Sequence, residues 1–167
     1  MTVDFDILKR KELRAAARLV GRAFEDYEYF TNYFPDLEER RKVLRGVVYR
    51  EYLTNFKRMH YLVAQMNGEL AAVAQVNAPD YKKPSDFQYL IHGWPLVYLG
   101  VNRRRLDDWL AMDAAAGKPC HEYQTKGTGI WYQNIAFYKR CGFEVFDERE
   151  FTYNGKTTRS WSVKRNI

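Results

Sequence analysis

The sequence predicts a mixed α/β fold of the α+β kind, in which helices cover a mostly antiparallel sheet. Two Asn-Gly pairs, Asn67-Gly68 and Asn154-Gly155, each separate two β-rich runs. Such a pair favours a two-residue hairpin turn, because both turn positions need a positive φ angle. Runs with helical spacing precede and separate these hairpins, so the predicted order is strand, two helices, hairpin, three helices, hairpin.

The chain begins with a predicted strand and helix. Residues 3–8 alternate apolar and polar side chains, which predicts the strand. The helix that follows has an apolar stripe formed by Leu13, Ala16, Ala17, Val20 and Phe24. An aromatic and acidic run then covers residues 24–34 without a strict period, and it predicts a loop or short helix that packs its rings.

A second helix and the first hairpin come next. Asp36 begins a predicted helix that reaches about residue 58, and Glu39 is placed to complete a capping box with it. The runs 61–66 and 70–76 form the predicted hairpin around its Asn-Gly turn.

The second half is predicted to hold three helices and the second hairpin, over residues 86–99, 102–116, 134–140 and 144–164. The triplet Gly117-Lys118-Pro119 ends the second of these helices, and Gly142 ends the third.

Composition excludes several classes of protein. Apolar residues are 46% of the 167 and charged residues 29%, which is a globular balance and excludes a disordered chain. Cys120 and Cys141 form neither metal spacing nor a disulfide framework, so we expect a reducing, cytoplasmic location. The longest uncharged run, residues 87–102, is shorter than the roughly 20 residues of a membrane span. We therefore expect no membrane partner.

The charge balance is mildly basic. Lys and Arg number 27 against 21 Asp and Glu, a net charge of +6 that favours anionic partners such as phosphates. The clusters 103–105 and 139–140 are basic, but Asp107 and Asp108 follow the first of them. No complete nucleic-acid motif accompanies these clusters, so we expect no nucleic-acid partner.

The segment 134–146, NIAFYKRCGFEVF, contains the pattern Asn-x-x-Phe-Tyr-x-x-x-Gly-Phe before a β-like run. It resembles the last helix and strand of the GNAT acetyltransferases. The opening order of elements agrees, and the segments 24–41 and 77–93 resemble a microbial and fungal branch of that family. The resemblance implies a GNAT fold and transfer of an acetyl group from acetyl-coenzyme A (acetyl-CoA) to a small-molecule or peptide amine.

The resemblance also implies catalytic residues. In the family a Tyr of the final helix protonates the leaving thiolate, and Tyr138 holds that position. A phenol, with a pKa near 10, stays protonated at neutral pH and can donate, although a core aromatic role is the alternative. Glu25 or Asp26 is the candidate base, since that region borders the acceptor in GNAT folds. His92 is a further candidate, with a structural role as its alternative.

A GNAT domain holds the pyrophosphate with a Gln/Arg-x-x-Gly-x-Gly/Ala loop that follows the fourth strand and opens a helix. Here the residues implied to bind the cofactor are Gln124, Lys126, Gly127, Gly129 and, further on, Asn134. The context differs from the family, because residues 118–123 do not read as a buried strand. Only residues 130–133 separate the loop from Asn134, which leaves no room for a helix of about 11 residues and a strand of about 5.

Two interpretations of this region stay open. In the first, 124–129 is the pyrophosphate loop, and the helix it opens, 130–140, already carries Tyr138. In the second, Trp131-Tyr132 begins the fourth strand, and the loop, helix and fifth strand are absent before Asn134. In both interpretations the centre of the cofactor site is incomplete. In both, apolar faces that the missing helix would have covered are exposed.

The predicted organisation is one GNAT-like domain over 1–167, with an N-terminal part, 1–123, a compressed cofactor region, 124–133, and a C-terminal helix and hairpin, 134–167. The function implied is an acetyl-CoA-dependent N-acetyltransferase with a truncated centre. The alternative is a non-catalytic GNAT-like remnant or binding module. The sequence leaves the acceptor amine and the oligomeric state open.

Overall fold

The computed structural model describes residues 2–77, 81–124, 130–131, 139–140 and 142–164. The chain divides between Arg103 and Arg104 into two compact units, each of which is described by itself. The first unit contains a sheet of strand order β1-β2-β3 and the second a sheet of order β4-β6-β5. All their ladders are antiparallel. The predicted mixed α/β fold is therefore confirmed, whereas the single-domain organisation stays a prediction.

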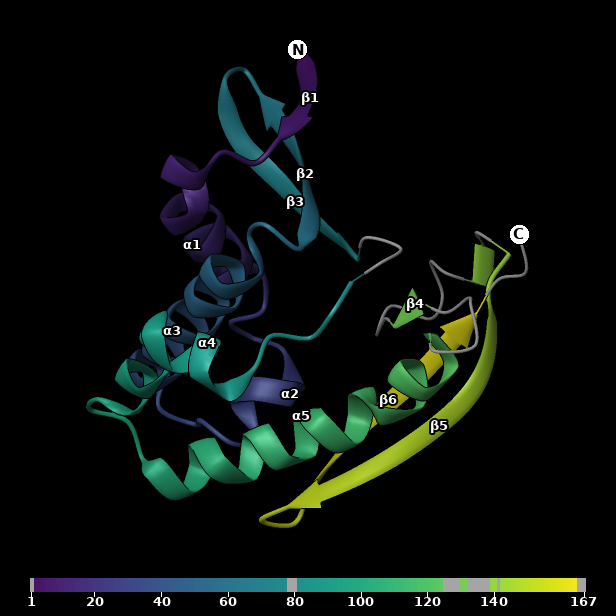
Figure 1. Cartoon of the computed structure of the whole chain (residues 1–167). Helices are drawn as coiled ribbons and strands as arrows, with labels where there is room; N and C mark the ends of the chain where they lie inside the picture. Colours follow the sequence, from purple (N-terminus) through teal and green to yellow (C-terminus); the bar gives the residue numbers. More distant parts are fainter. Residues whose placement is uncertain (1, 78–80, 125–129, 132–138, 141, 165–167) are drawn as a thin grey trace. The chain divides into compact units, whose positions relative to one another are not determined.

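Figure 1 shows the elements of both units along the chain. The first unit holds β1 (Val3–Ile7), η1 (Arg10–Glu12), α1 (Leu13–Ala23), α2 (Glu28–Thr31), α3 (Leu37–Asn55), β2 (Met59–Met66), β3 (Glu69–Asn77), α4 (Asp86–Ile91) and η2 (Trp94–Tyr98). The second holds α5 (Arg103–Gln124), whose first residue ends the first unit, β4 (Ile130–Trp131), β5 (Glu144–Tyr153) and β6 (Lys156–Lys164).

Both predicted hairpins are present. The turn between β2 and β3 has φ angles of 52° at Asn67 and 80° at Gly68. The turn between β5 and β6 has 50° at Asn154 and 75° at Gly155. Two successive positive φ angles define the turn that matches the twist of a hairpin, which is why the Asn-Gly pairs identified both of them.

The core of the first unit lies where α1 and α3 meet one face of the β1-β2-β3 sheet. Its buried side chains come from the end of β1, from both helices and from β2: Leu8, Leu13, Ala16, Tyr52, Tyr61 and Val63. The rings of Tyr52 and Tyr61 meet edge to face, with centroids 4.9 Å apart. The predicted stripe of α1 is thus confirmed at Leu13, Ala16 and Ala17, which are all buried.

The opposite face of this sheet is apolar and exposed, and we call it the open face. It carries Phe5 at 84% exposure, Ile7 at 63% and Leu62 at 49%, with Val3, Met66 and Val76 also exposed. Ile7 pairs with Leu62, and Leu62 pairs with Ala74, so these side chains form one continuous surface across three strands.

The start of α3 follows the sequence prediction only in part. The side chain of Asp36 accepts a hydrogen bond of 2.7 Å from the backbone N–H of Glu39, so Asp36 is the N-cap. The carboxylate of Glu39 accepts from the backbone N–H of Asn102 instead of reaching back to Asp36. The predicted capping box is therefore half formed, because the loop before α5 supplies a different donor to Glu39.

Two predicted helix boundaries are wrong. The helix predicted over 86–99 ends at Ile91, because Gly93 has a φ of 79° and a 3-10 helix follows it. The helix predicted to stop at 116 continues to Gln124 with Pro119 inside it. Proline has no N–H for the carbonyl four residues earlier, that of Ala115. Nη1 of Arg149, on β5, donates to that carbonyl at 3.1 Å and replaces the missing bond.

Candidate functional site

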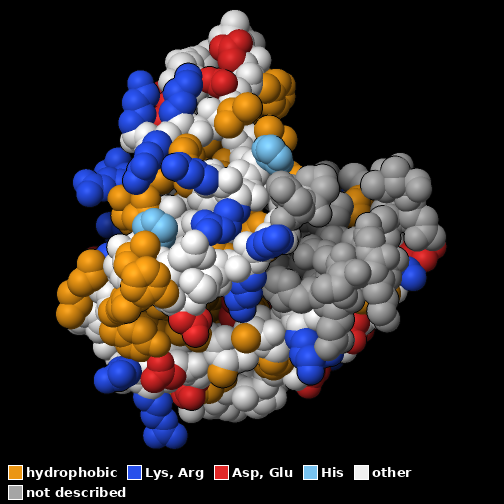
Figure 2. Space-filling model, in the orientation of Figure 1, with side chains coloured by type: hydrophobic (Ala, Val, Ile, Leu, Met, Phe, Trp, Pro, Cys, Tyr) orange, Lys and Arg blue, Asp and Glu red, His pale blue; other side chains and the backbone are white. Residues whose placement is uncertain are grey.

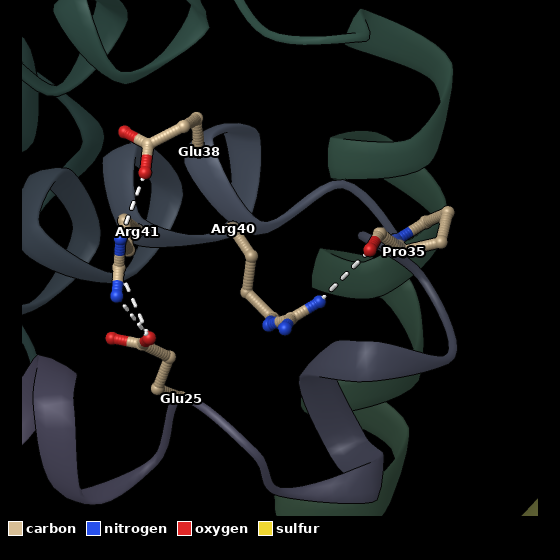
Figure 3. Close-up of polar contacts among 5 residues, drawn as sticks. All are labelled: Glu25, Pro35, Glu38, Arg40 and Arg41. Carbon is tan, nitrogen blue, oxygen red and sulfur yellow. Dashed lines mark hydrogen bonds and ion pairs between the residues drawn. The ribbon is translucent and has the colours of Figure 1, made fainter.

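The predicted base Glu25 lies in the turn after α1, against Arg41 of α3 (Figure 3). Nε of Arg41 donates to Oε1 of Glu25 at 3.0 Å, and its Nη2 lies 2.8 Å from the same oxygen. Nη1 of Arg41 donates to Glu38, three residues earlier on the helix, at 2.8 Å. Arg41 therefore joins two carboxylates, and the aromatic turn is tied to α3 through one of them.

The ion pair controls the ionisation of Glu25. The hydrogen bond from Arg41 lowers the pKa of Glu25 below its usual value, burial opposes the shift, and the charges of Arg41, Arg40 and Arg45 add to it. The side chain of Glu25 is 15% exposed. A general base works best with a pKa near the working pH, so Glu25 would act as one only after leaving Arg41. Asp26, in the same turn, is exposed.

Arg40, next to Arg41, fixes the other end of the aromatic run (Figure 3). Its side chain is 7% exposed, and its Nη1 donates to the carbonyl of Phe34 at 2.6 Å and to that of Pro35 at 3.2 Å. These bonds explain why a charged residue is buried at this point, because carbonyl oxygens solvate the guanidinium there.

Replacing Arg41 by methionine is expected to raise the pKa of Glu25 toward its usual value. Because folding depresses this pKa, the pair stabilises the fold above the unfolded-state pKa, and the stabilisation is lost as pH falls through the folded-state pKa. The variant should therefore lose less stability on acidification than the original chain. Carboxyl NMR titration and acid unfolding measure both effects. Arg159→Met, which removes an exposed pair with Glu150, is the control, and an unchanged Glu25 pKa in Arg41→Met would contradict the assignment.

The remaining predicted site residues lie mostly outside the described residues: Lys126, Gly127, Gly129, Asn134 and Tyr138. The backbone of Gln124 is described and forms the last residue of α5. His92 follows α4, and its Nδ1 is buried with no hydrogen-bond partner in the described part of the chain. The predicted base Glu25 belongs to the first unit and Gln124 to the second, and the grouping of the predicted site residues stays a prediction.

The predicted pyrophosphate loop, residues 125–129, lies outside the described residues, but the residues on either side of it are described. Residues 118–124 are helical, so the family's strand does not precede the loop. Ile130 and Trp131 form β4, which pairs antiparallel with β6 through Val163 and Ser162. The first interpretation, with a helix from Ile130, is therefore wrong at these two residues. The second expects a strand at Trp131, and it agrees with the structure there.

A polar and aromatic cluster at the end of α3 was not predicted from the sequence. Asn55 is fully buried, and its Nδ2 donates to the backbone carbonyl of Glu51 at 3.1 Å and to Oε1 of Glu51 at 2.7 Å. The hydroxyl of Tyr81 donates to Oδ1 of Asn55 at 3.2 Å. The hydroxyl of Tyr89, on α4, is bonded to Asn55 and Glu51 as well. The i, i+4 spacing of Glu51 and Asn55 was the one sequence signal for this cluster. That spacing does not indicate that Tyr81 and Tyr89 join it.

The phenols around this cluster are donors at neutral pH. Burial raises the pKa of Tyr52 to about 12, and it raises the pKa values of Tyr61 and Tyr89 above their ordinary range. A phenol that stays protonated can satisfy the Glu51 and Asn55 oxygens without adding a charge. The cluster therefore fastens the segment containing Tyr81 and Tyr89 to α3, which is a structural role.

The described residues contain neither a cluster of metal ligands nor a helix that could span a membrane. Over 2–77, 81–124 and the shorter described stretches, no three His, Cys, Asp or Glu residues are placed to hold a metal ion together. No helix within those same ranges combines the length and the apolarity that crossing a bilayer requires.

Comparison with solved structures identifies the class of fold. The chain is similar to a solved structure described as the GCN5-related N-acetyltransferase "Aminotransferase, Class-II" from Rhodopseudomonas palustris, with a TM-score of 0.53 and 15% identity over 100% of this chain and 97% of that one. A GNAT-family structure from Desulfovibrio desulfuricans aligns with a TM-score of 0.42 and 17% identity, over 97% of this chain and 98% of that one. No protein-family model and no curated protein matches the sequence. The chain therefore has the fold of the GNAT acetyltransferases, as its sequence predicted.

Proposed function

We propose that this chain is a GNAT-type N-acetyltransferase of the microbial and fungal branch, with acetyl-CoA as cosubstrate and a small-molecule or peptide amine as acceptor. The observation that carries the proposal is the fold similarity to a GCN5-related N-acetyltransferase over the whole chain. Residues 139–140 are helical, and Gly142 has a φ of 81°. Both observations support the proposal that the family's last helix, which would carry Tyr138, ends here. A cytoplasmic location belongs to the same proposal.

The second candidate is a non-catalytic GNAT-like protein with a truncated cofactor region. Two observations favour it. Residues 118–124, before the predicted phosphate loop, are helical and do not form the strand that precedes this loop in the family. The open face of the β1-β2-β3 sheet is apolar and exposed, which is what the loss of a covering helix would leave.

Thermal unfolding with acetyl-CoA separates the two candidates. A ligand that binds the folded state at 100 times its Kd stabilises it by about 2.7 kcal/mol, which raises the Tm by several degrees. The acetyltransferase proposal expects this shift at millimolar acetyl-CoA and a smaller one with ATP, which lacks the thioester arm. An unchanged Tm with acetyl-CoA would overturn the proposal and favour the non-catalytic protein. Where acetyl-CoA binds, Tyr138→Phe should reduce turnover more than cofactor affinity, and an unchanged rate removes Tyr138 from the mechanism.

A further inference from the structure

The outer side of α1 carries a row of arginines, which we call the basic row. Arg14, Arg18 and Arg22 are spaced four residues apart, so they follow one another along one side of the helix. All three are exposed. Figure 2 shows Lys and Arg side chains gathered over this part of the first unit. Leu13 and Ala16, which are buried, lie on the other side of α1, so the row faces away from the core.

Three further cations extend the row. Arg10 and Lys11 of η1 come directly before α1, and both are exposed. Arg45 of α3 is exposed as well. A Cβ atom at Gly21 of α1 would lie 3.7 Å from Cγ of Arg45, so the Arg45 side chain passes next to the α1 backbone. The positive surface therefore continues from η1 over α1 to α3.

A single acidic residue accompanies the row. Residues 9–22 contain six Lys and Arg side chains and one carboxylate, that of Glu12, which gives a charge of +5 against +6 for the whole chain. Oε2 of Glu12 accepts from the backbone N–H of Lys9 at 2.8 Å. Asp6, before this segment, pairs with Nζ of Lys9 at 2.9 Å. Lys9 thus takes up both nearby carboxylates and leaves the row positively charged.

The acidic residues beyond the end of α1 do not neutralise the row either. Glu25 is bonded to Arg41 of α3, and Asp26 and Glu28 are exposed. Within the described part of the chain, no ion pair is formed by any of the six cations of the row and its extensions: Arg10, Lys11, Arg14, Arg18, Arg22 and Arg45. Their charge is therefore available to a partner.

We propose that the basic row binds the phosphate backbone of a nucleic acid. Neighbouring arginines are about 6 Å apart along the helix axis, since each residue rises about 1.5 Å. A DNA strand presents a phosphate about every 3.4 Å of its axis, so a helix lying along a strand meets a phosphate near each arginine. A guanidinium can bond two phosphate oxygens at once. This proposal revises the expectation of no nucleic-acid partner, which considered only the clusters 103–105 and 139–140.

Two features favour this partner over other anionic ones. None of the exposed large apolar side chains belongs to residues 8–23, so α1 has nothing to insert into a bilayer. Five of the six cations are arginines, and those of the row have a regular spacing on a rigid helix. Regular spacing fits a polymer with regular phosphates better than a protein segment with irregular carboxylates. Because phosphate contacts carry no base information, we expect binding without sequence preference.

Fluorescence anisotropy with duplex DNA and with single-stranded RNA of equal length tests the proposal on the full chain. The measurement contains no acetyl-CoA, so its result does not depend on the proposed enzymatic function. About four phosphate contacts predict a roughly 100-fold loss of affinity between about 50 and 200 mM salt. The two nucleic acids show whether the backbone of a duplex or of a single strand is preferred. Absence of binding to both at low salt overturns the proposal.

The double variant Arg18→Gln/Arg22→Gln should weaken binding by about tenfold at low salt and reduce the salt slope by about 2. The control Arg103→Gln/Arg104→Gln removes the same charge from two exposed arginines of the cluster 103–105 and should bind as the original chain does. Circular dichroism shows whether each variant keeps its fold. Equal loss in the two variants overturns the proposal. Binding to poly-glutamate as tight as to nucleic acid also overturns it and assigns the row to an acidic protein segment.

Discussion

Replacing Asn55 by alanine should lower the free energy of unfolding by about 3 kcal/mol, because it removes the amide at the centre of a buried network. That amide donates to the carboxylate of Glu51 and accepts from the hydroxyl of Tyr81. Its loss removes one donor from the Glu51 carboxylate and the Asn55 acceptor from the Tyr81 hydroxyl, next to a residue position that is fully buried. Urea denaturation followed by circular dichroism measures the loss.

The control lies two residues away. Lys57 is exposed, and Lys57→Ala should change the unfolding free energy by less than about 0.5 kcal/mol. If Asn55→Ala were as mild as the control, the network would not hold the segment with Tyr81 and Tyr89 to α3. Hydrogen exchange in residues 81–91 supplies a second readout, since protection there should fall in Asn55→Ala before the rest of the unit unfolds.

Replacing Arg149 by methionine should destabilise the C-terminal part of α5, by about 2 kcal/mol. A proline inside a helix leaves one carbonyl without its usual donor, and here Nη1 of Arg149 supplies the bond to Ala115. Without it, the helix is expected to fray beyond residue 116, which is where the sequence predicted its end. Hydrogen exchange over residues 116–124 measures the fraying directly.

Arg159→Met is the matched control for this experiment. Arg159 lies on the other strand of the same hairpin, and its pair with Glu150 is exposed, with 59% of the Arg159 side chain accessible. Exposed ion pairs contribute little to stability, so exchange in α5 should be unchanged. Equal protection of residues 116–124 in both variants would show that α5 tolerates Pro119 without the side-chain bond.

Local rules determined much of this protein. The positive φ angles that Asn-Gly pairs adopt fixed both hairpins, the 3.6-residue period placed Leu13 and Ala16 in the core, and Asp36 was identified as an N-cap. Each feature depends on residues within a few positions of one another, so the sequence reveals it. The resemblance of residues 134–146 to the GNAT acetyltransferases, with an agreeing order of elements, implied the GNAT fold, and the similarity to a solved structure agrees.

Tertiary contacts decided the rest, because they join residues that the sequence places far apart. Arg41 lies 16 residues from Glu25 and converts a candidate base into an ion-paired carboxylate. Tyr81 lies 26 residues from Asn55, and the buried network exists only when they meet. Arg149, 34 residues beyond Ala115, satisfies the carbonyl that Pro119 cannot, so a helix continues past a residue that normally ends one. A proline inside a helix is about 3 kcal/mol less favourable than an alanine. A side-chain donor from another element offsets part of this cost.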